Sequence, residues 1–273
     1  MPDIPQRLLG ARPGRALALV AAAAFVAFVG LPVLAIFVRV VASGSLGATL
    51  TRPIVLEALR LSAITSLSAL ALALLIGTPL AYLLARHRFR GHELLDSLIE
   101  LPMVLPPAVA GIGLLMAFGR RGLVGEPLDA LGISIGFTTA AVVLAEAFVA
   151  APFYVRAARS AFFEVDRELE TVSRTLGVSD WGTFWRVTVP VAFPSLLGGA
   201  VMCWARALGE FGATIMFAGS FPGRTQTMPL AIYAALESDL DAALVLSAIL
   251  TITSFIVLVL LRASVRRLGG AYG

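Results

Sequence analysis

Long stretches without charged residues recur along the chain, and they constrain its fold more than any other feature of the sequence. A helix crosses the hydrocarbon core of a bilayer in about 20 residues. Stretches near that length cover 16–38, 61–85, 101–119, 138–155, 190–218 and 242–261. Only two of them contain charges: Glu146 lies in the fourth, and Arg206 and Glu210 lie in the fifth. The sequence therefore predicts an all-α integral membrane protein with about six transmembrane helices.

The composition argues against a soluble enzyme. Of the residues 59% are apolar and 14% are charged, whereas a soluble domain carries about a quarter charged residues. All 21 basic residues are arginine, so the chain has neither a phosphate-binding loop with lysine nor a Schiff-base lysine. Cys203 is the single cysteine, which excludes an internal disulfide and a cysteine-based metal site. We expect no catalytic residue, metal site or cofactor in this chain, and any ATP must bind to another chain.

The arginines also predict the orientation in the membrane. If the N-terminus is cytoplasmic, the inside connections hold 14 of the arginines, and the outside connections hold only Arg52, Arg120, Arg121 and Arg224. This bias follows the positive-inside rule and places both termini in the cytoplasm. The stretch 16–38 exceeds the about 7–15 apolar residues of a cleaved secretion signal, which favours a retained helix. Topology accounts for the net charge of +4, so we expect no binding to nucleic acid.

The longest inside connection, about 156–189, has the pattern of two short helices. Val165, Leu169, Val172 and Leu176 recur at helical spacing and predict one apolar stripe. Gly177 then supplies a helix stop, and Ser179-Asp180 a cap for a second helix.

Trp181, Phe184 and Trp185 fall on one face of the second helix, and Pro190 marks the return to the membrane. Apolar surface outside a bilayer typically marks a protein contact. The alternative is that the tryptophans belong to the aromatic belt of the membrane and the stripe packs on neighbouring helices.

Two charge-free stretches contain features of a pathway. Pro102, Pro106 and Pro107 predict a kink or break in the third, which either lines a pathway or improves packing. In the fifth, Arg206 and Glu210 stand one helical turn apart and are expected to pair. The pair either shapes a gate or fixes helix packing.

Small residues surround that pair. Gly209 and Gly212 permit close approach of backbones, and the hydroxyl of Thr214 is available to a passing anion. The residues that we assign to a translocation path or gate are Pro106, Pro107, Arg206, Gly209, Glu210, Phe211, Gly212 and Thr214.

The inside connection resembles the cytoplasmic loop of permeases in ATP-binding-cassette importers. Thr171-Val-Ser-Arg-Thr-Leu-Gly177 is followed after nine residues by Val187-Thr-Val-Pro190. The family pattern is Glu-Ala-Ala, three residues, Gly, nine residues, then Ile-x-Leu-Pro. The glycine and proline match, whereas the acid here lies one place earlier, at Glu170. The resemblance implies a loop that seats on the ATPase, with the coupling residues Glu170, Thr171, Val172, Ser173, Arg174, Gly177, Asp180, Trp181 and Pro190.

Further segments are similar to permeases of molybdate importers. They are Leu101-Pro-Met-Val-Leu-Pro-Pro107, Gly119-Arg-Arg-Gly122, Arg206-Ala-Leu-Gly-Glu-Phe-Gly-Ala-Thr214 and Thr225-Gln-Thr-Met-Pro-Leu-Ala-Ile-Tyr233. The core Gly-Glu-Phe-Gly-Ala also resembles sulfate permeases. The resemblance divides the chain into an N-terminus with an extra first helix (1–56), a permease domain (57–265) and a cytoplasmic tail (266–273).

The resemblance also implies the partners and the location. They are a second copy of the chain, two ATPase subunits that carry ATP and magnesium, and an extracytoplasmic oxyanion-binding protein, all at the inner (plasma) membrane. The expected function is ATP-driven import of molybdate or tungstate. A sulfate permease of the same architecture is one alternative, and a proton-coupled carrier that uses Glu146 or the pair Arg206–Glu210 is another.

A serine hydrolase is a further alternative, because Gly132-Ile-Ser134-Ile-Gly136 matches the pattern of a nucleophile elbow. That site needs a histidine within reach. The only histidines, His87 and His92, fall in an inside connection, whereas Ser134 falls outside. We therefore treat the match as accidental and expect both histidines to be solvated.

Overall fold

The structure is a computed structural model that describes residues 12–44, 47 and 52–269. The segment before residue 12, which includes Arg7, lies outside the described residues. So do most of the connection 45–51 and the last four residues of the expected tail.

The described residues form helices and connections, with no strand among them. In chain order the helices are α1 (Arg12–Ser43), α3 (Pro53–Arg86), α4 (His92–Val104), α5 (Pro107–Phe118), α6 (Gly125–Ala130), α7 (Thr139–Glu164), α8 (Arg167–Thr175), α9 (Asp180–Thr183), the π-helix η2 (Phe184–Thr188), α10 (Val189–Leu208), α11 (Gly212–Ala218), α12 (Met228–Leu236) and α13 (Leu240–Gly269).

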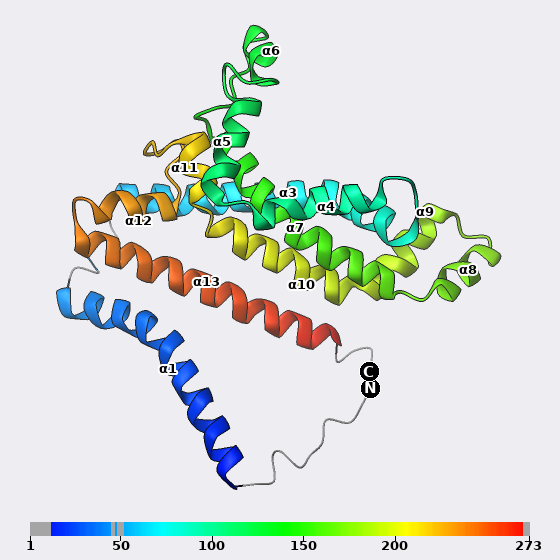
Figure 1. The fold of residues 1–273 in the computed structure, drawn as a ribbon, viewed down its shortest axis with the longest axis horizontal. Coiled ribbons are helices and arrows are strands. Elements are labelled where there is room, and N and C mark those ends of the chain that lie inside the picture. The colour runs from blue at the N-terminus through cyan, green and yellow to red at the C-terminus, as the bar shows by residue number, and fades with distance from the viewer. Residues whose placement is uncertain (1–11, 45–46, 48–51, 270–273) are drawn as a thin grey trace.

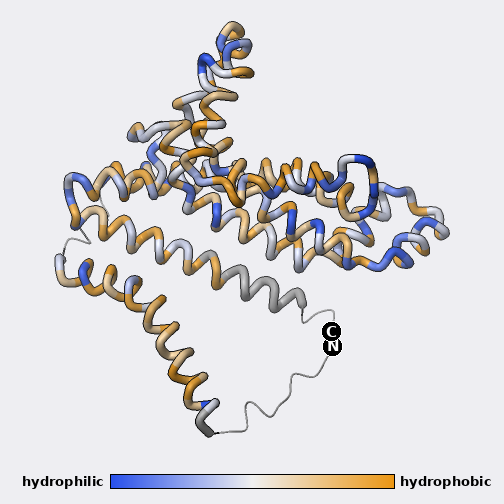
Figure 2. Tube along the Cα trace, viewed as in Figure 1, coloured by the Kyte–Doolittle hydropathy of each residue, from blue (hydrophilic) through white to orange (hydrophobic). Residues whose placement is uncertain are grey.

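Four continuous helices are long and apolar enough to cross a membrane: Gly14–Ser43, Pro53–Arg86, Thr139–Glu164 and Asp180–Leu208. The pair α4 and α5 passes the same test as one bent unit, and Leu240–Ile256 of α13 is a shorter apolar helix. This arrangement confirms the all-α membrane fold, and four or five candidate spans with one shorter apolar helix are roughly consistent with the six predicted. Apolar residues cover the long helices, and hydrophilic ones gather near α6 and around α8 and α9 (Figure 2).

The centre of the molecule is the packing of α3, α7 and α10, which run side by side in Figure 1. Alanines such as Ala69, Ala150 and Ala207 dominate this core and are fully buried. Small side chains let transmembrane helices approach closely, which gives dispersion contacts and interhelical hydrogen bonds. One such bond joins the hydroxyls of Thr78 on α3 and Tyr154 on α7 at 2.6 Å.

Helix α1 lies apart from this core, as Figure 1 shows. Its apolar window from residue 14 to 43 is almost entirely exposed within the chain. Near its C-terminal end Val40 packs against Val245 and Ala248 of α13. The assignment of residues 1–56 to an N-terminus with an extra first helix stays a prediction.

Three sequence-based expectations were wrong in detail. The stretch 101–119 is not one straight span, because α4 and α5 meet at an angle of 117°. The fifth span does not run to residue 218, because α10 ends at Leu208 and α11 is a separate helix. His92 is not solvated: it is buried, and its Nε2 lies 3.0 Å from the carbonyl of Leu84.

Candidate coupling loop and translocation path

The inside connection folds as the two short helices that the sequence predicts, and Ser179 caps the second as expected. The carboxylate of Asp166 accepts the N–H of Glu168 at 2.9 Å and begins α8. Gly177 follows α8 with φ of +83°, a left-handed conformation that disfavours other residues. The hydroxyl of Ser179 accepts the N–H of Gly182 at 3.2 Å and begins α9. We call residues 165–189 the coupling loop.

The apolar stripe of the coupling loop is shorter than predicted and faces outward. Val165 is not part of it, since this residue ends α7 and is only 3% exposed. Leu169, Val172 and Leu176 are 47%, 56% and 78% exposed. Within this chain the stripe therefore covers no core and is free to contact another protein.

Glu170 lies on the opposite, inward face of α8. Its carboxylate is almost completely buried and lies 2.7 Å from the guanidinium of Arg86, the last residue of α3. The same oxygen accepts the hydroxyl of Thr188 at 2.8 Å, and the other lies 3.5 Å from Arg174. Glu170 therefore binds groups within its own chain and is not available on the exposed face of α8.

The remaining polar residues of the motif tie the two helices together. The hydroxyl of Ser173 on α8 lies 3.0 Å from that of Thr183 on α9, and both residues are buried. The guanidinium of Arg174 reaches the carboxylate of Asp180 at 2.9 Å. Thr171 is exposed, and its hydroxyl only donates to a carbonyl within α8. Two side-chain contacts thus join α8 directly to α9.

Trp181 projects from this unit and is 72% exposed. Its ring stacks on Phe184 with the centroids 6.1 Å apart and meets Trp185 edge-on at 5.7 Å. Phe184 in turn contacts Tyr82 of α3, with centroids 5.0 Å apart. Pro190 follows in the first turn of α10, which continues from α9 and η2 without a break.

The second group of predicted residues lies where two helices break. Val104 ends α4, and Pro106 and Pro107 start α5 in a new direction. The break in the fifth span comes at Gly209, which ends α10, and α11 begins at Gly212. Both second halves, α5 and α11, pack against each other beside the main bundle (Figure 1).

Glycines make the contact between α5 and α11 possible. A Cβ on Gly111 would lie 2.7 Å from the carbonyl oxygen of Ala213, and one on Gly212 would lie 2.6 Å from Pro107. The broken halves are therefore in backbone contact, as the sequence predicted for Gly212 but not for Gly111.

The predicted ion pair forms across the break. Arg206 lies 2.7 Å from one carboxylate oxygen of Glu210, and the other oxygen accepts the N–H of Ala213 at 2.8 Å. Glu210 is 1% exposed in its side chain and Arg206 30%. Glu210 thus links the end of α10 to the first turn of α11.

Phe211 and Thr214 were also assigned to the path. Phe211 packs on another helix, and Thr214 is buried. The ring of Phe211 lies 5.3 Å from that of Tyr233 on α12. Thr214 is fully buried, so its hydroxyl does not face open space within this chain. Among the described residues this hydroxyl has no hydrogen-bond partner.

Helix α3 has a buried polar face that we did not predict from the sequence. Ser62, Thr65 and Ser66 are buried at helical spacing, and each bonds to a different element. Ser62 accepts the N–H of Met228 at 2.7 Å, Thr65 donates to Glu146 at 3.0 Å, and Ser66 accepts the indole N–H of Trp204 at 2.9 Å. The available signal was the run Ser-x-x-Thr-Ser inside a long apolar stretch.

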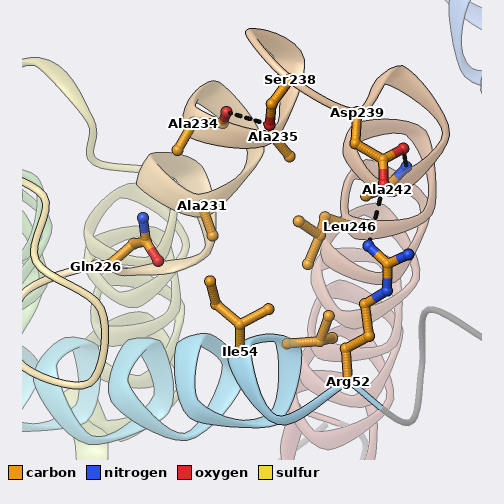
Figure 3. A pocket seen from close by; sticks show the side chains of 11 residues that line it. Arg52, Ile54, Gln226, Ala231, Ala234, Ala235, Ser238, Asp239, Ala242 and Leu246 are labelled. Atoms are coloured by element: carbon orange, nitrogen blue, oxygen red, sulfur yellow. Dashed lines mark hydrogen bonds and ion pairs between the residues drawn. The ribbon is translucent and has the colours of Figure 1, made fainter.

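A small pocket lies at the end of the molecule opposite the coupling loop, between α3, α12 and α13 (Figure 3). It has a volume of about 190 Å³. Arg52 and Asp239 pair at 3.0 Å at its edge. The N–H of Ala242 and the guanidinium of Arg52 lower the pKa of Asp239. The buried amide of Gln226 also lines the pocket.

Comparison with known proteins shows the family. The family described as "Binding-protein-dependent transport system inner membrane component" matches residues 77–270, most of the chain. The chain belongs to this family. As a member it is a multi-pass membrane component of a transport system and not an enzyme in its own right.

Several relatives are similar over much of their length. The "Molybdenum transport system permease protein ModB" of Mycobacterium tuberculosis is 46% identical over 236 residues, which cover 86% of this chain and 89% of the relative. ModB of Escherichia coli K12 is 44% identical over 67% of this chain and 80% of its own. The "Molybdate/tungstate transport system permease protein WtpB" of Thermococcus kodakarensis is 39% identical over 75% of this chain and 78% of its own.

Two solved importers have a similar fold. A chain of a bacterial ABC transporter that imports alginate matches with a TM-score of 0.71, 14% identity and coverage of 93% of this chain and 94% of that one. A chain of the methionine transporter MetNI matches with a TM-score of 0.57, 18% identity and coverage of 78% and 94%. The importer permease fold predicted from the sequence is therefore confirmed, whereas the roles of individual site residues stay predictions.

Proposed function

We propose that the chain is the membrane-spanning permease of an ATP-driven importer that moves molybdate, or the similar tungstate, into the cytoplasm. The observation that carries this proposal is the 46% identity, across 86% of the chain, with a protein named as a molybdenum transport permease. The 39% identity with a molybdate/tungstate permease supports the same class of anion.

The proposed assembly places two copies of the chain around a central path in the inner (plasma) membrane. Two ATPase subunits dock on the two coupling loops and carry ATP and magnesium, and an extracytoplasmic oxyanion-binding protein delivers the substrate. The exposed apolar stripe with Trp181 supports the ATPase seat, because contiguous exposed apolar residues typically mark a protein contact. The absence of lysine from the chain supports a separate nucleotide-binding subunit.

In this assembly, closure of the ATPase subunits draws the coupling loops together and rocks the helices about the central path. The breaks before α5 and α11 divide each span into a first half, of which α10 continues directly from the coupling loop, and a second half that packs separately. We assign the path or gate to this region, with Pro106, Pro107 and the segment Arg206–Thr214. The buried carboxylate of Glu210 is occupied by Arg206 and Ala213, which suits shaping the gate better than binding an anion.

Uptake of radiolabelled molybdate into vesicles with the assembled transporter and internal ATP tests the proposal. We expect uptake that depends on ATP, competition by tungstate, and little competition by excess sulfate. Equal competition by sulfate would move the assignment to a sulfate permease. Uptake that persists in vesicles without the ATPase subunit would instead indicate a secondary carrier.

A further inference from the structure

The most deeply buried ion pair at the loop end of the molecule joins Arg86 to Glu170. Their side chains are 7% and 5% exposed, and the guanidinium nitrogen lies 2.7 Å from the carboxylate oxygen. Removing two charges from water is costly, so a buried pair contributes little net stability. It does fix geometry, since breaking it leaves an uncompensated charge.

The two side chains join four separate elements at one point. Arg86 is the last residue of α3 and also donates to the carbonyl of Val165, which ends α7, at 3.0 Å. Glu170 lies on α8 and also accepts the hydroxyl of Thr188, which ends η2 and leads into α10. One guanidinium and one carboxylate thus hold the coupling loop to the three helices of the core.

The pair and the exposed stripe lie on opposite faces of the same short helix. Glu170 points inward, whereas Val172 and Leu176 are 56% and 78% exposed. A protein that contacts the exposed face therefore pushes on a helix whose other face is fixed to Arg86. The pair is a direct contact between this helix and the end of α3.

Helix α3 carries such a displacement to the region of the breaks. About 30 Å of helix separate Arg86 from Ser66, and the hydroxyls at Ser62, Thr65 and Ser66 bond to the start of α12, to α7 and to α10. Alanines of α3 pack on α7 and α10 between these two contacts. Helix α3 thus contacts the coupling loop at Arg86 and contacts α10, shortly before its break, at Ser66.

We propose that Arg86 is a positioning residue for energy coupling: it joins the coupling loop to α3, so that movement of the loop displaces the helix that contacts the broken spans. This inference rests on the proposed function, because it takes the coupling loop as the seat of the ATPase. It adds a residue outside the loop, 84 positions before Glu170 in the sequence.

The test uses the full chain assembled with its ATPase subunit in vesicles, with variants Arg86→Gln and Arg86→Lys. Three quantities are measured: retention of the ATPase subunit in a pull-down, ATP hydrolysis, and molybdate taken up per ATP hydrolysed. For Arg86→Gln we expect normal retention and a fall in uptake per ATP of about threefold or more. Arg86→Lys keeps a cation beside Glu170 and is expected to recover part of the loss.

Arg88→Gln is the matched control, because Arg88 is an exposed arginine two residues further along the chain. It is expected to leave all three quantities unchanged. Unchanged uptake per ATP in Arg86→Gln would overturn the inference while leaving the proposed function intact. Loss of ATPase retention in Arg86→Gln would also overturn it, since Arg86 would then only fold the loop. If the unaltered chain retains the ATPase but transports no molybdate, the proposed substrate fails instead.

Discussion

The carboxylate of Glu210 holds the guanidinium of Arg206 at 2.7 Å and at the same time accepts the N–H of Ala213 at 2.8 Å. One side chain therefore spans the break between α10 and α11. Both contacts are charge-assisted, and hydrogen bonds to charged groups are stronger than neutral ones. These two contacts help to fix the relative position of two helices that an unbroken helix would have held together by its backbone hydrogen bonds.

Different substitutions of Glu210 remove either the ion pair alone or both the ion pair and the backbone hydrogen bond. Glu210→Gln keeps an oxygen that can accept the N–H of Ala213 but loses the charge opposite Arg206, so we expect a cost of about 2 kcal/mol. Glu210→Ala loses both contacts and is expected to lower the unfolding temperature in detergent further. The double variant Arg206→Gln with Glu210→Gln removes both charges and is expected to recover part of the loss. Equal unfolding temperatures for all variants would contradict the linking role of Glu210.

Substitution of Gly177 tests whether coupling requires the left-handed backbone conformation at this position, because an added Cβ would meet no steric clash. Its φ is +83°, and a Cβ there would meet no atom within 4 Å. Gly177→Val is therefore expected to cost about 1–2 kcal/mol through the backbone alone, and to reduce uptake of molybdate per ATP hydrolysed. Gly177→Asn is the matched variant, because asparagine tolerates the left-handed region, and it should retain most coupling.

Gly91 supplies the positional control for this experiment. It has φ of +89°, also with open space around its Cβ position, but it lies between α3 and α4. Gly91→Val carries the same backbone penalty outside the coupling loop, so it should leave uptake per ATP unchanged. If it reduced coupling as much as Gly177→Val, the effect would not be specific to the loop.

Substitution of Trp181 tests whether the exposed face of the coupling loop binds the ATPase subunit. The side chain is 72% exposed, so Trp181→Ala should hardly change the unfolding temperature of the chain. A central tryptophan in an interface typically contributes about 2 kcal/mol or more, which predicts roughly thirtyfold weaker binding of the ATPase subunit in a titration. Leu123→Ala is the control, since Leu123 is an 87% exposed apolar residue in the connection between α5 and α6. Unchanged ATPase binding by Trp181→Ala would assign the ring to the aromatic belt of the membrane.

Substitution of Glu146 distinguishes between an ATP-driven importer and a proton-coupled carrier. It is 1% exposed, and one carboxyl oxygen accepts the hydroxyl of Thr65 at 3.0 Å. Glu146→Gln retains an oxygen for that bond but cannot carry a proton, so an ATP-driven importer should keep its uptake rate. Glu146→Leu loses the bond and is expected to destabilise the chain by about 0.6 kcal/mol. Abolished uptake in Glu146→Gln, with normal unfolding, would favour the carrier.

Much of this architecture follows from local signals in the sequence. The charge-free stretches predict the spanning helices because lipid allows few unpaired charges. The cap at Ser179 and the turn at Gly177 depend on neighbouring residues alone, and both have the predicted role.

The rest depends on contacts between distant positions. Prolines predict a break near Pro106 but not the angle of 117° between α4 and α5. The inward direction of Glu170 depends on Arg86, which is 84 residues earlier. No proline marks the end of α10 at Leu208. There the carboxylate of Glu210 accepts the N–H of Ala213 in the first turn of α11, a contact that the sequence did not predict.

Gly111 shows how sharply such distant contacts constrain a residue. A Cβ at Gly111 would lie 2.7 Å from the backbone oxygen of Ala213, whereas one at Gly113 in the same helix would meet nothing within 4 Å. Gly111→Ala is therefore expected to push α11 away from α5 at a cost of about 1–3 kcal/mol, as overpacking typically does. Gly113→Ala adds the same methyl group to the same helix, so helix propensity changes equally in both variants. Lower unfolding temperature and slower molybdate uptake in Gly111→Ala alone would show that transport depends on close contact between the two broken halves. Equal behaviour of the two variants would mean that α5 and α11 separate at no cost.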